Sequence, residues 1–328
     1  MPPDSTLLAF VQSLPKTETH LHLEGALPFE LLQRVRPEFT SPPASWAHNF
    51  KFRDFGHFEQ ELLDMAFSWF TSPEHYHEAA KIIFAQHLAQ NVRYVETSFA
   101  SGVIEFGGLN GREVLAAIRA AVPAGLEVRV FLGIHHNGAG PKMKPVLDEA
   151  LTWKDLAGVD LHGFEDAPVE AWTAPYWAAA RQAGKYTKAH AGEFMGADFI
   201  RRILGELQPQ RIEHGTRSVE DAAVVAEIKR RGIALDMCPI SNHKLMPGIS
   251  LGNHPIRRLF DAGVKVTVST DDPISFGNTV TDEYIALAER SGFSRQELVQ
   301  LARNGFEVAL LSDAQKKLWL GELDAASR

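Results

Sequence analysis

The sequence lacks most of the features that mark secreted or membrane-spanning proteins. Cys238 is the only cysteine among 328 residues, which excludes an intrachain disulfide framework and suits a reducing cytoplasm. No uninterrupted apolar run is long enough to cross a bilayer. The N-terminus, Met1 to Ser5, has neither the basic segment nor the apolar segment of a signal peptide. We therefore expect a cytoplasmic protein with no membrane partner.

Positive charge is also scarce. The chain has 33 Lys and Arg against 41 Asp and Glu, a formal net charge of -8. Without a basic surface, nucleic acid is not an expected partner, whereas a small neutral substrate is. A hydrophobic content of 45% is enough for a large core, and no linker divides the chain. One α/β domain over residues 1–328 is predicted.

Strand-like and helix-like segments alternate along the chain. Eight segments have strand character, and each is followed by a helix or a long loop: 16–23, 91–99, 127–135, 158–163, 185–190, 211–214, 233–239 and 264–270. This alternation implies a parallel sheet, and eight such units predict a closed (β/α)8 barrel, the TIM-barrel fold. Additional C-terminal helices over 282–290, 295–311 and 312–320 are expected outside the barrel.

Two helical segments carry more specific expectations. Ser218 is expected to cap a helix over 219–231, which Gly232 would end. The stretch from Phe55 to Phe70 is rich in Phe, Leu and Trp at helical spacing. That pattern is typical of core, and an apolar lid over a pocket is the alternative; both remain open.

The first strand carries two histidines on one face. Side chains alternate between the faces of a strand, so His20 and His22 point the same way. Two imidazoles on one face can hold one metal ion, although a lone His-x-His pair also occurs as a polar rim.

Further polar candidates stand at the ends of later strands. His190 ends the fifth strand, His214 the sixth, and Asp271 and Asp272 the eighth. Because the ends of barrel strands converge on one face, these side chains are expected to meet in one cavity. Three imidazoles and a carboxylate suit Zn²⁺ and also admit other divalent transition ions. Since a catalytic zinc lowers the pKa of a bound water toward neutrality, hydrolysis is the expected reaction class.

Several short motifs together resemble the adenosine deaminase family of the amidohydrolase superfamily. In chain order they are His20–Gly25, His190–Glu193, Glu213–Gly215, Cys238–Asn242 and Thr270–Pro273. In addition, Asp160–Gly163 resembles the substrate-binding turn of that family. The similarity runs from about Pro15 to about Tyr284. Each motif alone is weak, but the combination is very specific.

The resemblance implies a metal site and a set of catalytic residues. One zinc ion per subunit would be bound by His20, His22, His190 and Asp271. Asp271 would also accept a proton from the bound water. His214 would orient the hydroxide that attacks C6 of a 6-aminopurine, and Glu193 would protonate N1 before ammonia leaves. An aromatic amine leaves only after the ring is protonated and attacked, so an acid and an activated water are both needed.

The resemblance also implies substrate contacts. Asp272 would hydrogen-bond N7 and the backbone N–H of Gly163 would meet N3, with His22 and Glu24 completing the substrate site. Glu24 stands where members acting on adenosine often have an aspartate for the ribose 5′-hydroxyl, and glutamate is familiar in members that take adenine. Gly163 instead follows the nucleoside type, since adenine-specific members have a serine-rich turn there. His162 replaces a small residue.

Three substrates therefore remain open. Conversion of adenosine to inosine and ammonia ranks first, and adenine or 6-aminodeoxyfutalosine are the alternatives. A phosphorylated substrate is less favoured, although Lys244 could reach an anionic group. A cyclic amidohydrolase on the same platform would need a binuclear centre with a lysine after the fourth strand. The turn from Asp160 to Glu165 has no lysine, which favours a mononuclear site.

Other polar residues have simpler interpretations. Glu96 is expected to pair with a buried arginine, and Cys238 to pack as a small hydrophobe. A packing role is favoured over a site role for the remaining histidines near strand ends, which are His135, His136, His162, His243 and His254. The oligomeric state is not readable from the sequence.

Overall fold

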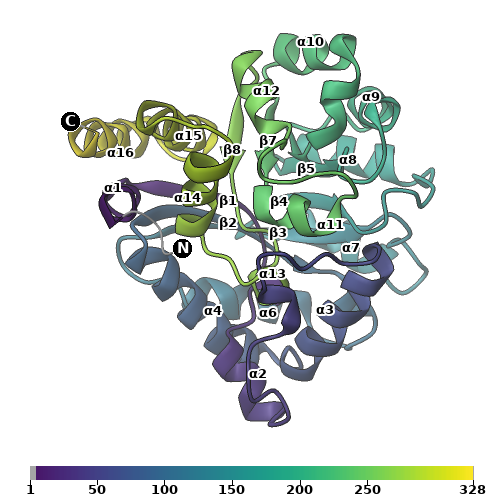
Figure 1. The fold of residues 1–328 in the computed structure, drawn as a ribbon. Helices are drawn as coiled ribbons and strands as arrows, with labels where there is room; N and C mark the ends of the chain where they lie inside the picture. The colour runs from purple at the N-terminus through teal and green to yellow at the C-terminus, as the bar shows by residue number, and fades with distance from the viewer. Residues whose placement is uncertain (1–4, 328) are drawn as a thin grey trace.

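The computed structural model describes residues 5–327 and contains an eight-stranded parallel barrel surrounded by helices (Figure 1). The two ends of the predicted 1–328 domain, including residues 1–4 of the N-terminal segment, lie outside the described part. The strands follow chain order around the barrel: β1 Lys16–His22, β2 Val92–Ala100, β3 Glu127–His135, β4 Leu156–His162, β5 Tyr186–Ala191, β6 Arg211–His214, β7 Ala234–Met237 and β8 Val266–Val268. The predicted (β/α)8 fold is confirmed.

The barrel closes through the segment that follows β8. Leu21 and Asp271 form a parallel bridge. The backbone N–H of His22 donates to the carbonyl of Asp271 at 3.1 Å, and the N–H of Asp271 donates to the carbonyl of His20 at 3.1 Å. Closure therefore brings the acidic end of the last strand against the two histidines of the first.

Helices and helical turns fill the connections. The helices of the first half are α1 Ser5–Ser13, α2 Phe29–Val35, α3 Phe55–Trp69, α4 Pro73–Ala89, α5 Gly102–Glu105, α6 Gly111–Ala120 and α7 Lys144–Ala150. Those of the second half are α8 Thr173–Gln182, α9 Ala197–Glu206, α10 Ala222–Arg231, α11 Pro239–Leu245, α12 Ile256–Asp261 and α13 Pro273–Phe276. The 3-10 turns are η1 Glu24–Ala26, η2 Ala44–Trp46 and η3 Thr216–Glu220.

The C-terminal addition consists of α14 Val280–Arg290, α15 Arg295–Val308 and α16 Asp313–Ala326. As expected, these helices lie outside the barrel (Figure 1). Helix α15 packs on β1 and β8, and α16 packs on α15. The addition thus covers the place where the barrel closes. Among the described residues, no helix combines the length and the apolar character that spanning a bilayer requires.

One predicted helix start is wrong. The segment expected as one helix capped by Ser218 is divided into η3 and α10. Asp221 caps α10, because its carboxylate accepts a hydrogen bond from the N–H of Ala223 at 2.7 Å. The predicted end is confirmed, with Gly232 in a left-handed conformation at φ 67°.

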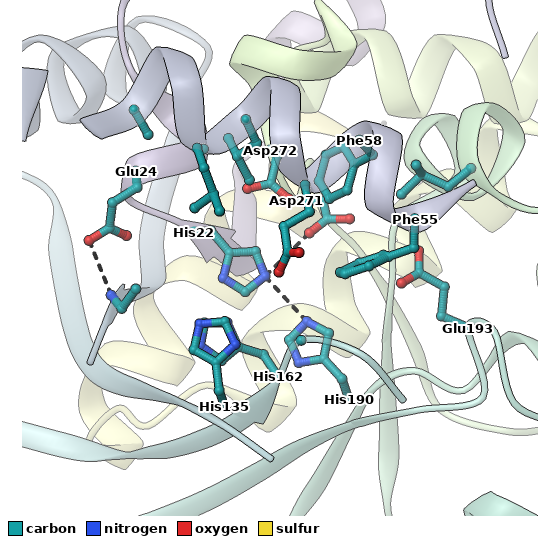
Figure 2. Close-up of a pocket in the computed structure, with 18 of the residues that line it drawn as sticks. His22, Glu24, Phe55, Phe58, His135, His162, His190, Glu193, Asp271 and Asp272 are labelled. Atoms are coloured by element: carbon teal, nitrogen blue, oxygen red, sulfur yellow. Dashed lines mark hydrogen bonds and ion pairs between the residues drawn. The ribbon is translucent and has the colours of Figure 1, made fainter. Parts of the chain in front are cut away.

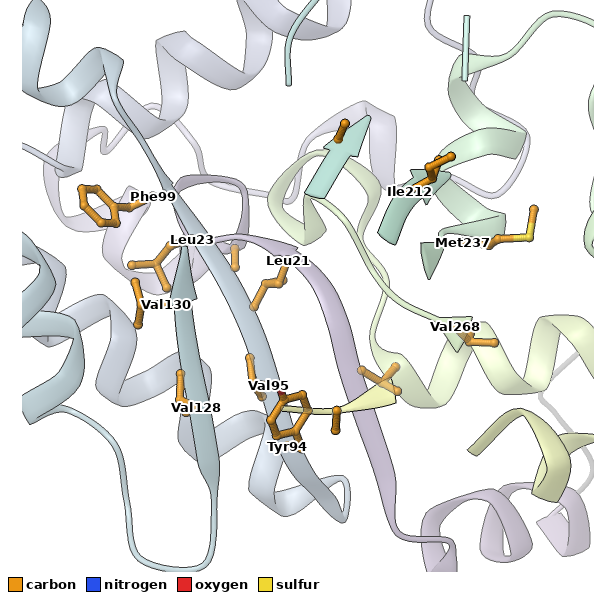
Figure 3. Close-up of a cluster of buried hydrophobic side chains, with 14 of the residues drawn as sticks. Leu21, Leu23, Tyr94, Val95, Phe99, Val128, Val130, Ile212, Met237 and Val268 are labelled. Carbon is orange, nitrogen blue, oxygen red and sulfur yellow. The ribbon is translucent and has the colours of Figure 1, made fainter. Parts of the chain in front are cut away.

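Apolar strand residues form the core between the barrel and its helices (Figure 3). On β2, Val95 and Phe99 belong to this core, whereas Glu96 and Ser98 on the alternate face take part in polar contacts. Since the apolar face packs on helices, the polar face is available to build a site inside the barrel.

Candidate active site

The carboxyl ends of the strands surround a pocket that α3 covers (Figure 2). Its empty volume, including the open mouth, is about 780 Å³. Phe55 and Leu62 of α3 line this pocket, while Met65 and Trp69 of the same helix belong to the core. One face of α3 therefore covers the pocket, as the lid interpretation expects, and the other face packs in the core.

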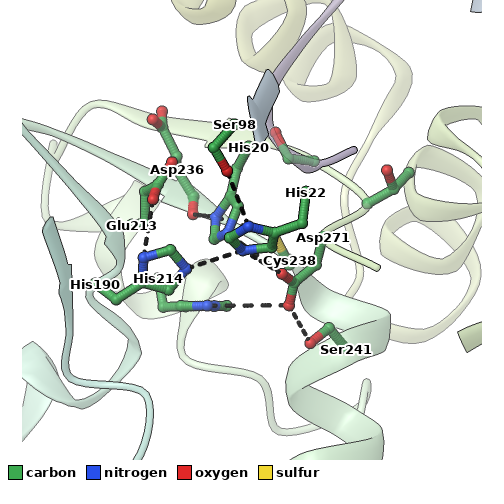
Figure 4. Close-up of polar contacts among 12 residues, drawn as sticks. His20, His22, Ser98, His190, Glu213, His214, Asp236, Cys238, Ser241 and Asp271 are labelled. Atoms are coloured by element: carbon green, nitrogen blue, oxygen red, sulfur yellow. Dashed lines mark hydrogen bonds and ion pairs between the residues drawn. The ribbon is translucent and has the colours of Figure 1, made fainter. Parts of the chain in front are cut away.

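Four predicted metal ligands meet at the floor of the pocket (Figure 4). Nε2 of His22 lies 3.3 Å from Nε2 of His20 and 3.2 Å from Nε2 of His190. Oδ1 of Asp271 lies 3.3 Å from Nε2 of His20 and 3.4 Å from Nε2 of His22. Ligands about 2.0–2.1 Å from a tetrahedral zinc ion are separated by about 3.3–3.4 Å, so these spacings fit such an ion.

Hydrogen bonds at the opposite ring nitrogens orient the three imidazoles. Nδ1 of His20 donates to the carbonyl of Asp236 at 3.3 Å, and Nδ1 of His190 donates to the carbonyl of Leu161 at 3.0 Å. Nδ1 of His22 lies 3.0 Å from the hydroxyl of Ser98. With the protons on Nδ1, the Nε2 lone pairs face one another, an arrangement that a cation stabilises.

Buried charges lie beneath the ligands. Oε2 of Glu213 is 2.9 Å from Nδ1 of His190, and its Oε1 accepts from Lys188 Nζ at 2.9 Å. Lys188 Nζ also lies 2.8 Å from Oε2 of Glu96 and 3.5 Å from Oδ2 of Asp236. This cluster connects β2, β5, β6 and β7 directly below the metal ligands.

Two interpretations made for buried residues are confirmed. Glu96 forms an ion pair with Arg211, and both side chains are buried. Cys238 is a buried free cysteine whose Sγ lies 3.5 Å from Nδ1 of His20, and burial raises the pKa of its thiol well above the usual value. It therefore packs as a neutral group behind His20, a predicted metal ligand.

Glu193 lies beside this cluster as a buried carboxylic acid. Burial raises its pKa well above the usual value, and the neighbouring charges of Asp271 and Glu165 add to the increase. Its Oε1 accepts a hydrogen bond from Nδ2 of Asn242 at 3.1 Å. Burial thus favours the protonated form of Glu193, whose Oε2 faces His214.

Glu165 fixes the backbone of the loop that carries Glu193. Its carboxylate accepts hydrogen bonds from three consecutive N–H groups, those of Glu193 at 3.0 Å, Phe194 at 2.9 Å and Met195 at 2.6 Å. Three such donors hold an anion firmly. No sequence motif indicated a role for Glu165.

His214 is a neutral imidazole between Glu193 and Asp271. Burial lowers its pKa well below the usual value. Its Nδ1 accepts from Asn242 Nδ2 at 3.1 Å, and its Nε2 lies 3.5 Å from Oε2 of Glu193 and 3.9 Å from Oδ2 of Asp271. Asp271 is further held by the hydroxyl of Ser241, which donates to its Oδ2 at 2.6 Å.

The backbone is strained at two of these residues. His214 has φ 63° and Asp271 has φ 68°, values uncommon outside glycine. Left-handed conformations of this kind cost about 1–3 kcal/mol each and gather at functional sites. The fold therefore tolerates strain to aim these two side chains at the same point.

Asp272 faces the pocket from the other side. Its Oδ1 is buried and has no hydrogen-bond partner among the described residues. Burial raises its pKa well above the usual value, and the charge of Asp271 adds to this. Gly25 makes room for it, since a Cβ there would lie 1.7 Å from Oδ1 of Asp272. Burial therefore favours the protonated form of Asp272, and its Oδ1 has no hydrogen-bond partner among the described residues.

Glu24 and Gly163 complete the predicted substrate set, and both line the pocket. Oε1 of Glu24 accepts hydrogen bonds from the hydroxyl of Tyr76 and from the N–H of Ala100, the latter at 3.1 Å. Burial raises the pKa of Glu24. Gly163 directly follows β4 with φ 93°, a conformation that requires glycine.

Several sequence-based expectations need correction. His135 and His162, for which packing roles were favoured, line the pocket. His254 packs as expected, but its Nε2 also donates to Oδ1 of Asn242 at 3.2 Å. Lys244 does not face the pocket, because its ammonium group donates to the carbonyls of Ser45 and Phe276.

Asn242 and Ser241 are functional candidates that the sequence analysis quoted only as part of a motif. Their place directly after β7, at the same mouth as the predicted ligands, was the available signal. As expected, His136 stacks on Phe199, and His243 bonds to backbone carbonyls.

The fold and this polar cluster define a metal-dependent hydrolase of the TIM-barrel class. The family model described as adenosine deaminase matches residues 15–326. The chain is 33% identical to an adenine deaminase from Sphingopyxis alaskensis, over 97% of this chain and 96% of that protein. It therefore belongs to the adenosine deaminase family and is a hydrolytic enzyme that acts on C–N bonds.

Solved structures agree with this assignment. An adenine deaminase from Arthrobacter aurescens superposes with a TM-score of 0.85 at 25% identity, over 95% of this chain and 98% of the other. An amidohydrolase from Burkholderia ambifaria, solved with bound zinc, has a TM-score of 0.85 at 22% identity, over 100% of this chain and 95% of the other. The second comparison shows the shared fold.

Proposed function

We propose that this chain converts adenine to hypoxanthine and ammonia with one zinc ion per subunit. The observation that carries this proposal is the pair of buried acids, Glu193 and Asp272, on either side of the ligand cluster. In a 6-aminopurine, the acceptors N1 and N7 flank C6 in the same way. Both acids have pKa values raised by burial, so each can donate a hydrogen bond to one acceptor.

His20, His22, His190 and Asp271 would hold the zinc ion, whose chemistry when bound is to lower the pKa of a water. Asn242 places the proton of His214 on Nε2, from which it can orient that water toward C6. Oδ2 of Asp271 can accept a proton from the water. Oε2 of Glu193 delivers a proton to N1, which makes C6 electrophilic.

The atoms of the reaction balance with these residues. Water forms a new C–O bond at C6, and the C–N bond to the amino group breaks. The proton taken by Asp271 passes to the departing amine, which leaves as ammonia. The remaining proton of the new C6 hydroxyl returns to Glu193 as the C6 carbonyl forms, which restores the acid. The net change is adenine plus water to hypoxanthine plus ammonia.

Adenine is preferred over adenosine, which the sequence analysis ranked first, for two reasons. Relatives that match nearly the whole chain at 30–33% identity are named adenine deaminases. Glu24, longer than the aspartate associated with ribose binding, is held by Tyr76 and by the end of β2. The pocket therefore holds Glu24, rather than the shorter aspartate, in a fixed position.

The test is the initial rate of ammonia release from adenine and from adenosine by zinc-loaded protein. We expect adenine to be the faster substrate, and Glu193→Gln to lose about 10²- to 10⁴-fold in kcat. Glu59→Gln is the matched control, because Glu59 lines the same pocket from α3 and is expected to leave kcat within a few-fold.

Faster turnover of adenosine would overturn the adenine proposal. Turnover of neither substrate would direct the search to larger 6-aminopurine nucleosides. Metal analysis provides the second test. We expect about one zinc per chain, lost together with activity on chelation, whereas two per chain would favour the binuclear cyclic amidohydrolase alternative.

A further inference from the structure

Two histidines of the pocket have no part in the chemistry described above. His135 ends β3 and His162 ends β4, and the two are paired in register. Their ring centroids are 4.5 Å apart, and the ring of His162 stacks on His22 at 5.4 Å. Both lie on the side of His22 that faces away from Asp272 (Figure 2). They form one wall of the pocket.

The two imidazoles contribute ring contacts but no hydrogen bonds to the described part of the protein. Among the described residues, no hydrogen bond is made to either ring, and Nε2 of His162 is buried without a partner. A neutral imidazole carries one donor and one acceptor, and leaving such groups unpaired away from water is costly. A bound ligand or a water can supply the partner that such an atom lacks in a pocket wall.

The two strands are shaped to seat these rings. A Cβ on Gly133 would lie 2.9 Å from Cε1 and 3.0 Å from Nε2 of His162. A Cβ on Gly163 would lie 2.7 Å from Nδ1 of His135. Each histidine therefore occupies space that a glycine on the neighbouring strand leaves open, so the wall is built into the backbone.

The placement of the acids decides which edge of the base meets this wall. With N1 at Glu193, N7 at Asp272 and C6 at the metal ligands, the edge that remains carries N3 and N9. That edge is directed toward Gly163 and the two histidines. In free adenine N9 carries a hydrogen that an imidazole nitrogen can accept, whereas in a nucleoside N9 carries the sugar.

We propose that His162, backed by His135, accepts a hydrogen bond from the N9 edge of the free base and fills the space that a sugar would need. His162 is thus a specificity-determining residue for a free 6-aminopurine. This inference rests on the proposed function. It also explains why a large side chain stands where the family resemblance leads one to expect a small residue.

The experiment compares adenine, 9-methyladenine and adenosine as substrates of the zinc-loaded enzyme. 9-Methyladenine lacks the N9 hydrogen but adds only one methyl group, which separates hydrogen bonding from size. We expect the wild type to favour adenine over 9-methyladenine by at least about tenfold in kcat/KM. In His162→Ala we expect adenine to lose about tenfold, mainly through KM, and the adenosine-to-adenine ratio to rise at least about tenfold.

Two further variants keep the result specific. His162→Asn retains a hydrogen-bonding side chain of smaller size and is expected to recover part of the adenine preference over 9-methyladenine. His77→Ala, on the outer helix α4, is the control and is expected to change no ratio. Calorimetric Kd values for hypoxanthine and 9-methylhypoxanthine supply a readout independent of turnover, and their ratio should fall toward one in His162→Ala.

The outcomes separate the two proposals. Suppose that the wild type deaminates adenine and that His162→Ala has the same zinc content. If the rate ratios among the three substrates and the Kd ratio of the two products are then unchanged in His162→Ala, only the role of His162 is overturned. A wild type that deaminates no free adenine would overturn the proposed function, and this inference with it.

Discussion

The side-chain amide of Asn242 donates from Nδ2 both to Nδ1 of His214 and to Oε1 of Glu193, each at 3.1 Å. One group thereby decides where two protons lie, on Nε2 of His214 and on Oε2 of Glu193. The other end of the amide is fixed as well, because its Oδ1 accepts from the hydroxyl of Thr216 at 2.9 Å and from Nε2 of His254 at 3.2 Å. Asn242 is therefore a positioning residue for both proton-handling groups.

Substitution of Asn242 tests this arrangement. We expect Asn242→Ala to lower kcat by about 10- to 100-fold with a smaller change in KM, because the acid and the imidazole lose their common donor. Asn242→Asp should be worse, since a carboxylate offers no donor at neutral pH. Steady-state kinetics at equal zinc content measure the effect. Unchanged kcat in both variants would show that Asn242 has no such role.

The raised pKa of Glu193 predicts a specific pH dependence. The proposed mechanism needs the protonated acid, so kcat/KM should fall as pH rises through the elevated pKa. Glu165→Gln removes one of the negative charges that raise this pKa. We expect the descending limb to move to lower pH in that variant. The measurement is the pH profile of kcat/KM for the wild type and for Glu165→Gln. A descending limb that moves to higher pH in the variant would contradict the assignment of Glu193 as the acid.

Gly25 predicts a binding defect. In Gly25→Ala the new Cβ would collide with Oδ1 of Asp272, so this carboxyl must turn away from the pocket. Loss of one substrate hydrogen bond should raise KM for adenine about tenfold. Gly205→Ala, whose Cβ would meet nothing within 4 Å, is the control and should leave KM unaltered. Equal KM values for the two variants would argue against contact between Asp272 and substrate.

Lys188 predicts a large effect on stability. Lys188→Met leaves Glu213 without its cationic partner and reduces the neutralisation of Glu96 and Asp236. Breaking buried pairs of this kind costs about 3–5 kcal/mol in the free energy of unfolding. Urea denaturation of the zinc-loaded proteins measures the change. Lys144→Met, which breaks an exposed i,i+4 pair, should cost about 0.5 kcal/mol or less.

Much of the fold was predictable because each strand has a local signature. The segment 211–214 was predicted as a strand and forms β6, Arg211–His214. The cluster of candidate metal ligands was predictable for a related reason: polar residues at the ends of buried strands stand out, and the barrel brings these ends together. The last strand is shorter than expected, Val266–Val268, because the segment after it meets β1 through the isolated bridge between Leu21 and Asp271 rather than as a continuous strand.

The supporting residues were less accessible to sequence reasoning. Glu165 acts by meeting the backbone of residues 193–195, and Asn242 by reaching two groups on other strands. Loop residues have no periodicity that would reveal such partners. The place of His162 in the pocket wall was not predictable, because a strand pattern indicates the face of a side chain but not whether its nitrogens find partners.

Asp271 has a second consequence for the molecule. Its main chain pairs with β1, while its side chain faces His20 and His22 of the same strand. An ion bound by these side chains would therefore join β1 to the segment after β8, which the backbone also joins. Separation of β1 from the segment after β8 would also pull apart the groups that hold the ion, so we expect opening of the barrel and loss of a bound ion to occur together.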